Sequence, residues 1–251
     1  MTLPADSTIF DFGRPDEYAR LWKSPYGWQI YPIGEINQII PVQTRGYYID
    51  HGTVDVIAQI LRLKRVATPV MIDGGANIGN ITLGVKHHIP NLRVHCFEAQ
   101  RIIAQMLAGT VSLMSWKDVF VHNVALTDGT LYTVDVPVYD YKQPGSFGSI
   151  ELGRKENAEH IRQDSTNQWE PVEGRSIDSY NFPQVDLLKL DVESMEEQVL
   201  IGAKDTINRC KPIMFIEHIK SDRKNLESLV RSLDYTIDDK ISSIDLVCWP
   251  N

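Results

Sequence analysis

Residues 70–80 read Val70-Met71-Ile72-Asp73-Gly74-Gly75-Ala76-Asn77-Ile78-Gly79-Asn80, and this stretch decides the fold of the 251-residue chain. The apolar run 70–72 is typical of a short buried strand that ends on Asp73. The glycines that follow predict a tight turn, and the helical pattern over 80–88 predicts that the turn leads into a helix. In such a turn a ligand can approach the backbone and meet the N-terminus of the helix.

Two carboxylates indicate which cofactor this turn holds. Asp73 lies where a dinucleotide such as NAD would place its pyrophosphate, and a carboxylate there repels phosphate. S-adenosylmethionine has no phosphate and carries a cationic amine and a sulfonium, so a carboxylate helps to hold it. Glu98 ends the next predicted strand, from which it can accept hydrogen bonds from ribose hydroxyls. The alternative is that Asp73 caps the helix and that Glu98 is a surface acid.

Short apolar runs alternate with helical patterns from Pro69 onward, which predicts a doubly wound α/β fold with a mostly parallel sheet. The predicted strands are 70–72, 92–97, 118–122, 185–190 and 212–216, followed by a closing hairpin of 235–241 and 244–249. The predicted helices are 51–66, 80–88, 103–114, 195–207 and 226–233.

Two parts of the chain depart from this alternation. Residues 1–50 show no sustained period, and we expect an irregular arm that packs on the core through its own aromatic side chains. Residues 51–251 form the expected cofactor-binding domain. Within it, 127–175 is predicted to be an insertion that serves as a lid, with 145–149 as its mobile tip. Phe147 in that tip would offer its ring to the acceptor.

Composition excludes several classes of protein. The net charge of −8 and the pI of about 5.4 argue against a nucleic-acid partner, which would require a basic face. No apolar run approaches the ~18 residues that span a bilayer, and no secretory signal is recognisable. The three cysteines are scattered and odd in number, which argues against disulfides. We therefore expect a reduced, cytoplasmic protein.

Six motifs in one order extend the interpretation beyond the glycine loop. The chain resembles FkbM-family methyltransferases over about residues 70–220, on segments 73–79, 97–99, 122–126, 176–180, 185–193 and 214–218. The resemblance implies a class I (Rossmann-like) methyltransferase fold, with a seven-stranded sheet whose last strand is antiparallel. It also implies methyl transfer from S-adenosylmethionine, often to a hydroxyl of a sugar or natural product. Two departures from the family pattern are Ala99, where proline is usual, and Ser194, where glycine is usual.

The resemblance also assigns residues to the cofactor. The glycine loop would hold the methionine end, Glu98 the ribose, and Asn123 would lie near the adenine. The cofactor-binding residues so implied are Asp73, Gly74, Gly75, Ala76, Asn77, Gly79, Glu98, Asn123 and Asp191.

Charged residues gather at the ends of the fourth and fifth predicted strands, beyond which ligands of open α/β sheets bind. Lys189, Asp191 and Glu193 surround the end of the fourth strand, and Glu217 and His218 lie at the end of the fifth. A hydroxyl acceptor must lose its proton as the methyl arrives, and His218 is the first candidate for the base, with Asp191 and Glu217 as orienting groups or alternative bases. Lys189 either takes part in the site or pairs with a nearby carboxylate and holds the strands together.

Three further alternatives stay open. Asp191, Glu217 and His218 could bind Mg²⁺ or Mn²⁺, which would hold a diol acceptor, or the site could work without metal. The competing enzyme class is an NAD-dependent oxidoreductase, and the competing non-enzyme is a degenerate methyltransferase fold that acts as a binding module. The expected partner is a small-molecule acceptor, such as a sugar or glycoconjugate, rather than nucleic acid.

Overall fold

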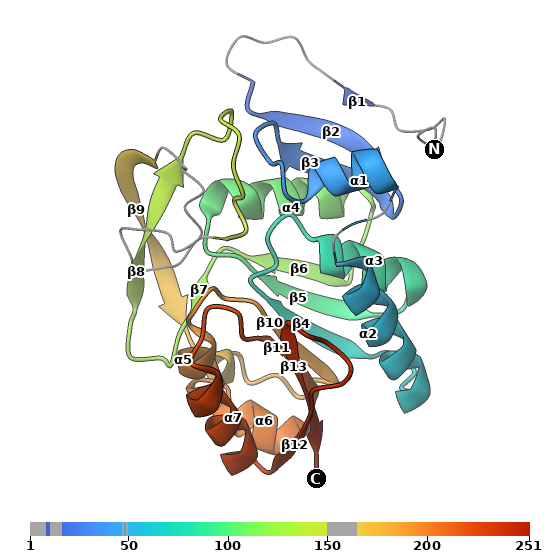
Figure 1. Cartoon of the computed structure of the whole chain (residues 1–251), viewed down its shortest axis with the longest axis vertical. Coiled ribbons are helices and arrows are strands. Elements are labelled where there is room, and N and C mark those ends of the chain that lie inside the picture. The colour runs from blue at the N-terminus through green and yellow to red at the C-terminus, as the bar shows by residue number, and fades with distance from the viewer. Residues whose placement is uncertain (1–8, 11–16, 47, 49, 150–164) are drawn as a thin grey trace.

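A seven-stranded sheet forms the centre of the computed structural model, which describes residues 9–10, 17–46, 48, 50–149 and 165–251 (Figure 1). Six strands of this sheet run in the same direction, and β13 runs antiparallel to them. This arrangement confirms the predicted fold class. In spatial order the strands are β12 (Tyr235–Asp238), β13 (Asp245–Pro250), β11 (Ile213–Glu217), β10 (Leu187–Leu190), β4 (Val70–Gly74), β5 (Arg93–Phe97) and β6 (Val119–His122).

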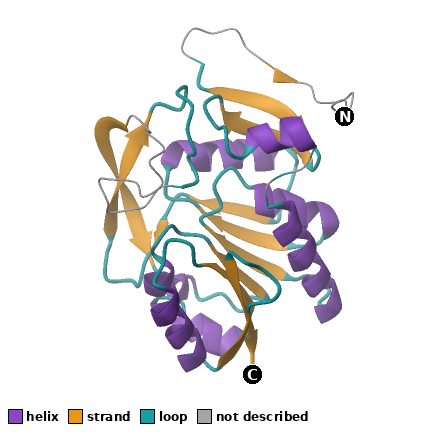
Figure 2. Ribbon diagram, in the orientation of Figure 1, coloured by secondary structure: helices purple, strands orange, loops and turns teal. Residues whose placement is uncertain are grey.

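Two layers of helices cover the sheet (Figure 2). One face packs against α2 (His51–Lys64), α3 (Asn80–His88) and α4 (Arg101–Leu113). The other face packs against α5 (Glu196–Ile201), α6 (Lys204–Cys210), α7 (Arg223–Ser232) and the short helix η1 (Ile177–Tyr180). Consecutive strand residues alternate between the two cores, as with Met71 and Ile72, because side chains of a strand point to opposite faces.

The order in which strands are added to the sheet reverses at the boundary between the neighbouring strands β4 and β10. From β4 it continues to β5 and β6 on one side, whereas β10 is followed by β11 on the other. The first residue after β4, Gly75, has φ +76°, and a Cβ added there would lie 1.8 Å from the backbone oxygen of Asp191. Glycine is therefore required at this point, which is where open α/β sheets bind their ligands.

The predicted single helix over 195–207 is instead two helices, α5 and α6. The chain turns between them at Gly202, where an added Cβ would lie 2.2 Å from the backbone oxygen of Thr127. The helical period runs through this position, so the break follows from a contact with a distant segment and not from the local pattern.

The prediction of an irregular N-terminal arm was wrong. Strands β2 (Ala19–Ser24) and β3 (Gly27–Pro32) form an antiparallel hairpin, β1 (Ile9–Phe10) pairs with β2, and α1 (Ile39–Arg45) follows. Aromatic residues occupy both faces of this hairpin, so the sequence lacks the alternation that usually indicates a strand. The arm packs on α4 mainly through β3.

Gln29 of β3 joins the arm to the glycine loop. Its side chain is fully buried, and its Nε2 donates to the backbone oxygen of Ile78 (3.1 Å) and to Oδ1 of Asn80 (2.8 Å). The hydroxyl of Tyr48 donates to its Oε1. Two hydrogen bonds of the Gln29 amide therefore hold the N-terminal segment against the start of α3, and the third orients the amide from within that segment.

The insertion contains β8 (Thr133–Tyr139) and β9 (Ser165–Arg175), which pair antiparallel, and β9 also pairs with β7 (Ala125–Leu126). Residues 150–164 of the predicted lid lie outside the described residues. Phe147 is buried, and its ring packs 4.8 Å from that of Tyr141, so the prediction that it faces an acceptor was wrong. Its backbone N–H donates to Glu35 and its oxygen accepts from Gln100, which anchors the expected mobile tip.

Two further expectations concern the chain as a whole. The three cysteines are free thiols, as predicted. In the described part of the chain, no helix combines the length and the apolar character that crossing a membrane requires.

We expect the Gln29→Leu variant to lose about 2–4 kcal/mol of unfolding free energy, because it leaves buried partners in the arm and in α3 without hydrogen bonds. Urea denaturation would measure the loss. The matched control is Gln105→Leu, on the exposed side of α4, which should change the stability by less than about 0.5 kcal/mol. Equal stabilities of the two variants would show that the arm is not anchored through Gln29.

Candidate functional site

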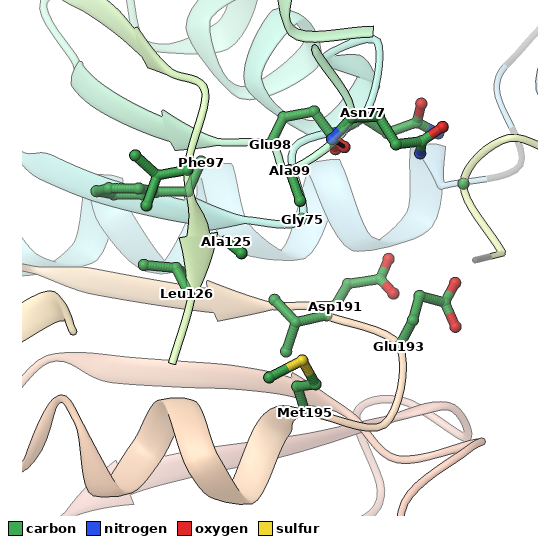
Figure 3. Close-up of a pocket in the computed structure, with 14 residues that line it drawn as sticks. Gly75, Asn77, Phe97, Glu98, Ala99, Ala125, Leu126, Asp191, Glu193 and Met195 are labelled. Carbon is green, nitrogen blue, oxygen red and sulfur yellow. Dashed lines mark hydrogen bonds between the residues drawn. The ribbon is translucent and has the colours of Figure 1, made fainter. Parts of the chain in front are cut away.

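A cleft opens at the carboxyl ends of β4, β5 and β10, where the sheet reverses direction (Figure 3). It is lined by Gly75, Asn77, Phe97, Glu98, Ala99, Gln100, Val124, Ala125, Leu126, Gly148, Asp191, Val192, Glu193 and Met195.

The glycine loop forms one wall of the cleft. The backbone N–H groups of Gly75 and Ala76 both donate to the oxygen of Phe97, at 3.0 Å each, which fixes the loop on the end of β5. A Cβ added at Gly74 or at Gly79 would meet a buried leucine side chain, at 2.9 and 2.4 Å respectively. These two glycines therefore allow close packing behind the loop, and Gly75 and Asn77 line the cleft.

Glu98 is buried beside the loop, so the alternative that it is a surface acid is wrong. Its Oε2 accepts from the N–H of Asn77 (2.9 Å) and its Oε1 from the N–H of Gln100 (2.8 Å). Burial raises the pKa of Glu98 to about 7, although these two hydrogen bonds act in the opposite direction. The carboxylate therefore lies on the cleft wall with its orientation fixed.

Asn123 supports this wall from behind. Its Nδ2 donates to the backbone oxygens of Glu98 (2.9 Å) and Ala99 (3.0 Å), so it fixes the turn after β5. The residues that follow it line the apolar end of the cleft, together with Phe97 and Met195. The sequence does not indicate these apolar residues as part of the site, although 124–126 belongs to one of the six motifs.

Asp73 lies in a smaller polar pocket next to the cleft. Its side chain is fully buried, its Oδ2 accepts from the hydroxyl of Thr82 (2.6 Å), and its Oδ1 has no hydrogen-bond partner. Burial raises the pKa of Asp73, while Lys189 opposes the rise. The pocket is lined by Gln38, Asp50, Asp73, Gly75, Ala76, Asn77, Asn80, Ile81, Lys189 and Asp191.

Lys189 is buried in the sheet, directly beside Asp73 in the pairing of β10 with β4. Its Nζ donates to Oδ2 of Asp191 at 2.9 Å. Burial opposes the charge on Lys189, but the carboxylates of Asp191 and Asp73 outweigh it and raise the lysine pKa above its usual value. The lysine therefore stays an ammonium ion that holds together the ends of two strands.

Three carboxylates meet at the outer part of the cleft. Oxygens of Asp191, Glu193 and Glu217 lie within 4.8 Å of one another, and Figure 3 shows two of these side chains, Asp191 and Glu193, side by side. Burial, and then the charge of Asp191, raise the pKa values of both glutamates. Lys220 lies 2.8 Å from Oε2 of Glu193 and neutralises part of this charge.

His218 does not belong to this group of ligand atoms, in contrast to the set expected for a metal ion. Its backbone N–H donates to the oxygen of Ile244 (3.0 Å), and its ring interacts electrostatically with Asp245. Glu193, and not His218, is the third residue of the group with Asp191 and Glu217, because the loop after β10 turns back toward the end of β11. The sequence predicts Glu193 at this end of the sheet, but the predicted set of metal ligands did not include it.

The loop after β10 is strained. Glu193 has φ +53° and Ser194 has φ +76°, both in the left-handed region that favours glycine. The second of these positions is the one where the FkbM pattern usually has glycine. Ser194 therefore stands in place of the usual glycine at a position whose positive φ favours glycine.

Comparison with known proteins identifies the relatives of this fold. The family described as "Methyltransferase FkbM domain" matches residues 73–237. The crystal structure of methyltransferase FkbM from Methylobacillus flagellatus KT aligns with a TM-score of 0.52 and 19% identity, over 83% of this chain and 50% of that one. The chain thus spans about half the length of that protein.

A second solved structure, precorrin-6y C5,15-methyltransferase from Geobacter metallireducens GS-15, aligns with a TM-score of 0.49 and 10% identity. That alignment covers 88% of this chain and 100% of the other. A comparison with curated protein sequences gave no match.

We expect the Ser194→Gly variant to be about 1 kcal/mol more stable than Ser194→Ala, because only glycine adopts the positive φ of this position without strain. Both variants lack the hydroxyl that donates to the backbone oxygen of Glu193, so the comparison isolates the backbone. Chemical denaturation would measure the difference. An alanine variant as stable as the glycine variant would show that the loop is not strained.

Proposed function

Because the chain belongs to the methyltransferase FkbM family, we propose that it transfers the methyl group of S-adenosylmethionine to a hydroxyl of a small acceptor, such as a sugar or natural product. The observation that carries this proposal is the cleft at the switch point of the sheet and the pocket next to it, whose polar groups are mainly carboxylates and side-chain amides. The cofactor, when bound, supplies an electrophilic methyl group on a sulfonium.

The residues of the cleft fit the parts of this cofactor. Phe97, Leu126 and Met195 provide an apolar end suited to a purine ring. Glu98 can accept hydrogen bonds from ribose hydroxyls while its present bonds hold it in place. Asp73 offers a buried oxygen that lacks a partner, which suits an ammonium group.

The same groups argue against a dinucleotide. A pyrophosphate at the glycine loop would face Asp73 and Asp191, and like charges in a buried site repel strongly. Lys189 is the only cation among the described residues that line the cleft and the polar pocket, and it is already paired with Asp191. The site therefore favours a cationic cofactor over NAD.

The three neighbouring carboxylates of Asp191, Glu193 and Glu217 support a hydroxyl acceptor. Glu193 and Glu217 can each accept a hydrogen bond from a hydroxyl and take up its proton as the methyl bond forms. Their pKa values are raised to about 8 and about 9, so each of them, when ionised, is a stronger base than an exposed glutamate. His218, beside Asp245, stays an alternative base.

The same three carboxylates fit a divalent ion less well than they fit a hydroxyl acceptor. A cation already lies against one of the three carboxylates, because the ammonium of Lys220 contacts Glu193. We therefore favour a metal-free reaction, and a role for Mg²⁺ or Mn²⁺ stays a prediction. Once an acceptor is known, turnover in EDTA separates the two cases, because a metal-dependent reaction would stop and resume on addition of either ion.

Occupying the cleft by mutation tests cofactor binding directly. We expect Ala99→Trp to weaken the binding of S-adenosylhomocysteine at least about tenfold, because overpacking a filled site costs about 1–3 kcal/mol. Ala108→Trp, on the exposed side of α4, is the control and should bind as the unmodified protein does. Titration calorimetry would measure both, with NAD as a second ligand that should not bind.

Binding of NAD in place of S-adenosylhomocysteine would contradict the proposed function. Binding without methyl transfer to any member of a panel of sugars and phenols would instead favour the binding module. Mass spectrometry of the panel, incubated with S-adenosylmethionine, provides that measurement.

The raised pKa of Glu98 predicts how cofactor affinity depends on pH. Below about pH 7 the carboxyl holds a proton and becomes a poorer acceptor for ribose hydroxyls. Affinity for S-adenosylhomocysteine should therefore fall as the pH drops from 8 to 6, by up to about tenfold for one linked proton. In Glu98→Gln the binding should be weaker and this component of the pH dependence should vanish. Parallel pH profiles of the two proteins would exclude Glu98 as the group responsible.

A further inference from the structure

We propose that Asp50, which precedes α2, binds the amino group at the methionine end of the cofactor, and that Gln38 forms the outer wall of this subsite. This inference rests on the proposed function and deepens it. Both residues lie before residue 73, where the family match begins, and neither belongs to any of the motifs discussed above.

The polar pocket that contains Asp73 supplies the geometry. It shares Gly75, Asn77 and Asp191 with the main cleft, so the two hollows adjoin at the glycine loop. Gln38 and Asp50 of the N-terminal segment also line the pocket. A ligand that extends from the cleft past the loop would therefore meet the N-terminal segment.

Asp50 occupies the N-cap position of α2 without acting as a cap. Aspartate is among the preferred residues at this position because its carboxylate can accept from the first N–H groups of the helix. Here the side chain makes no capping hydrogen bond, and among the described residues it is the backbone oxygen that accepts, from the N–H of Val54 (3.0 Å). The carboxylate lines the polar pocket instead.

The charges around this pocket are unbalanced. Asp50, Asp73 and Asp191 line it, together with the single ammonium of Lys189. That ammonium is bonded to Asp191, and Oδ1 of Asp73 has no hydrogen-bond partner. Buried carboxylates require a compensating charge, so the pocket suits one further cation with N–H donors. A primary ammonium has three such donors.

Gln38 is held rigidly at the edge of the pocket. Its Oε1 accepts from Nδ2 of Asn80, the first residue of α3, at 2.6 Å. Its backbone N–H donates to Glu35, which also accepts from the N–H of Phe147. The N-terminal segment therefore brings a preformed wall to the pocket, so the ligand does not have to order a mobile loop.

Two ligands that differ only at the methionine end test the inference. S-adenosylhomocysteine has the amino acid end, and 5′-methylthioadenosine has a methyl group in its place. We expect Asp50→Asn to weaken S-adenosylhomocysteine about ten- to a hundredfold, as for loss of a hydrogen bond to a charged group. The affinity for 5′-methylthioadenosine should change less than about twofold.

Decarboxylated S-adenosylmethionine, which keeps the amine and lacks the carboxylate, should lose affinity in Asp50→Asn as S-adenosylhomocysteine does. This ligand separates a contact with the amine from one with the carboxylate. The matched control is Asp55→Asn, which removes a carboxylate from the exposed side of α2 and should leave all three affinities unchanged. Calorimetry measures each pair, and thermal melting confirms that the variants are folded.

Several results would overturn the inference. Unchanged binding of S-adenosylhomocysteine by Asp50→Asn would exclude the contact, and an equal loss for 5′-methylthioadenosine would show a general disturbance of the cleft. If Asp50→Asn does not fold, Gln38→Leu replaces it and should show the same selective loss, severalfold in size. Failure of the unmodified protein to bind any of the ligands would refute the proposed function itself, which is a different outcome.

Discussion

The contact on which the rest of the site depends is the approach of Gly75 to the backbone of Asp191. At this contact two adjacent parallel strands end and the chain leaves them in opposite directions. Any side chain at residue 75 would push the strand ends apart. Because none is present, Asp73, Lys189 and Asp191 come together at the edge of the sheet, where the buried ammonium of Lys189 donates to Asp191 and lies beside Asp73 of the neighbouring strand.

This arrangement explains how several carboxylates can lie close together in one site. Lys189 and Lys220 each hold one carboxylate, and backbone amides hold Glu98. The remaining negative charge is reduced because burial raises the pKa values of the glutamates at the mouth. A cationic ligand would complete the set of charges, whereas an anionic one would add to an existing excess.

Much of the fold could be predicted because its signals are local. The alternation of apolar runs and helical patterns depends on neighbouring residues, as does the glycine loop, and both predictions were confirmed. The errors occurred where distant segments decide the outcome. The hairpin of β2 and β3 was missed because both of its faces are covered. Phe147 was misplaced because its partners, Tyr141 and Glu35, could not be recognised from the glycines on either side of it.

The site residues show the same contrast. The position of Glu98 could be predicted because it lies at the end of a predicted strand. Gln38 and Gly148 could not be assigned to the pockets, because they come from segments without any motif.

The hydrogen bonds that enclose the pockets have a consequence for the order of folding. Gln29 and Asn80 are 51 residues apart in sequence, and Glu35 and Phe147 are 112 residues apart. Closing loops of this length costs chain entropy before any contact repays it, whereas the β4–α3–β5 unit forms from neighbouring residues. We therefore expect the sheet and its helices to assemble first and the enclosure of the pockets to follow. During synthesis, the hairpin of β2 and β3 emerges before the segment around Phe147, so the bond between Glu35 and Phe147 has to wait for that later segment.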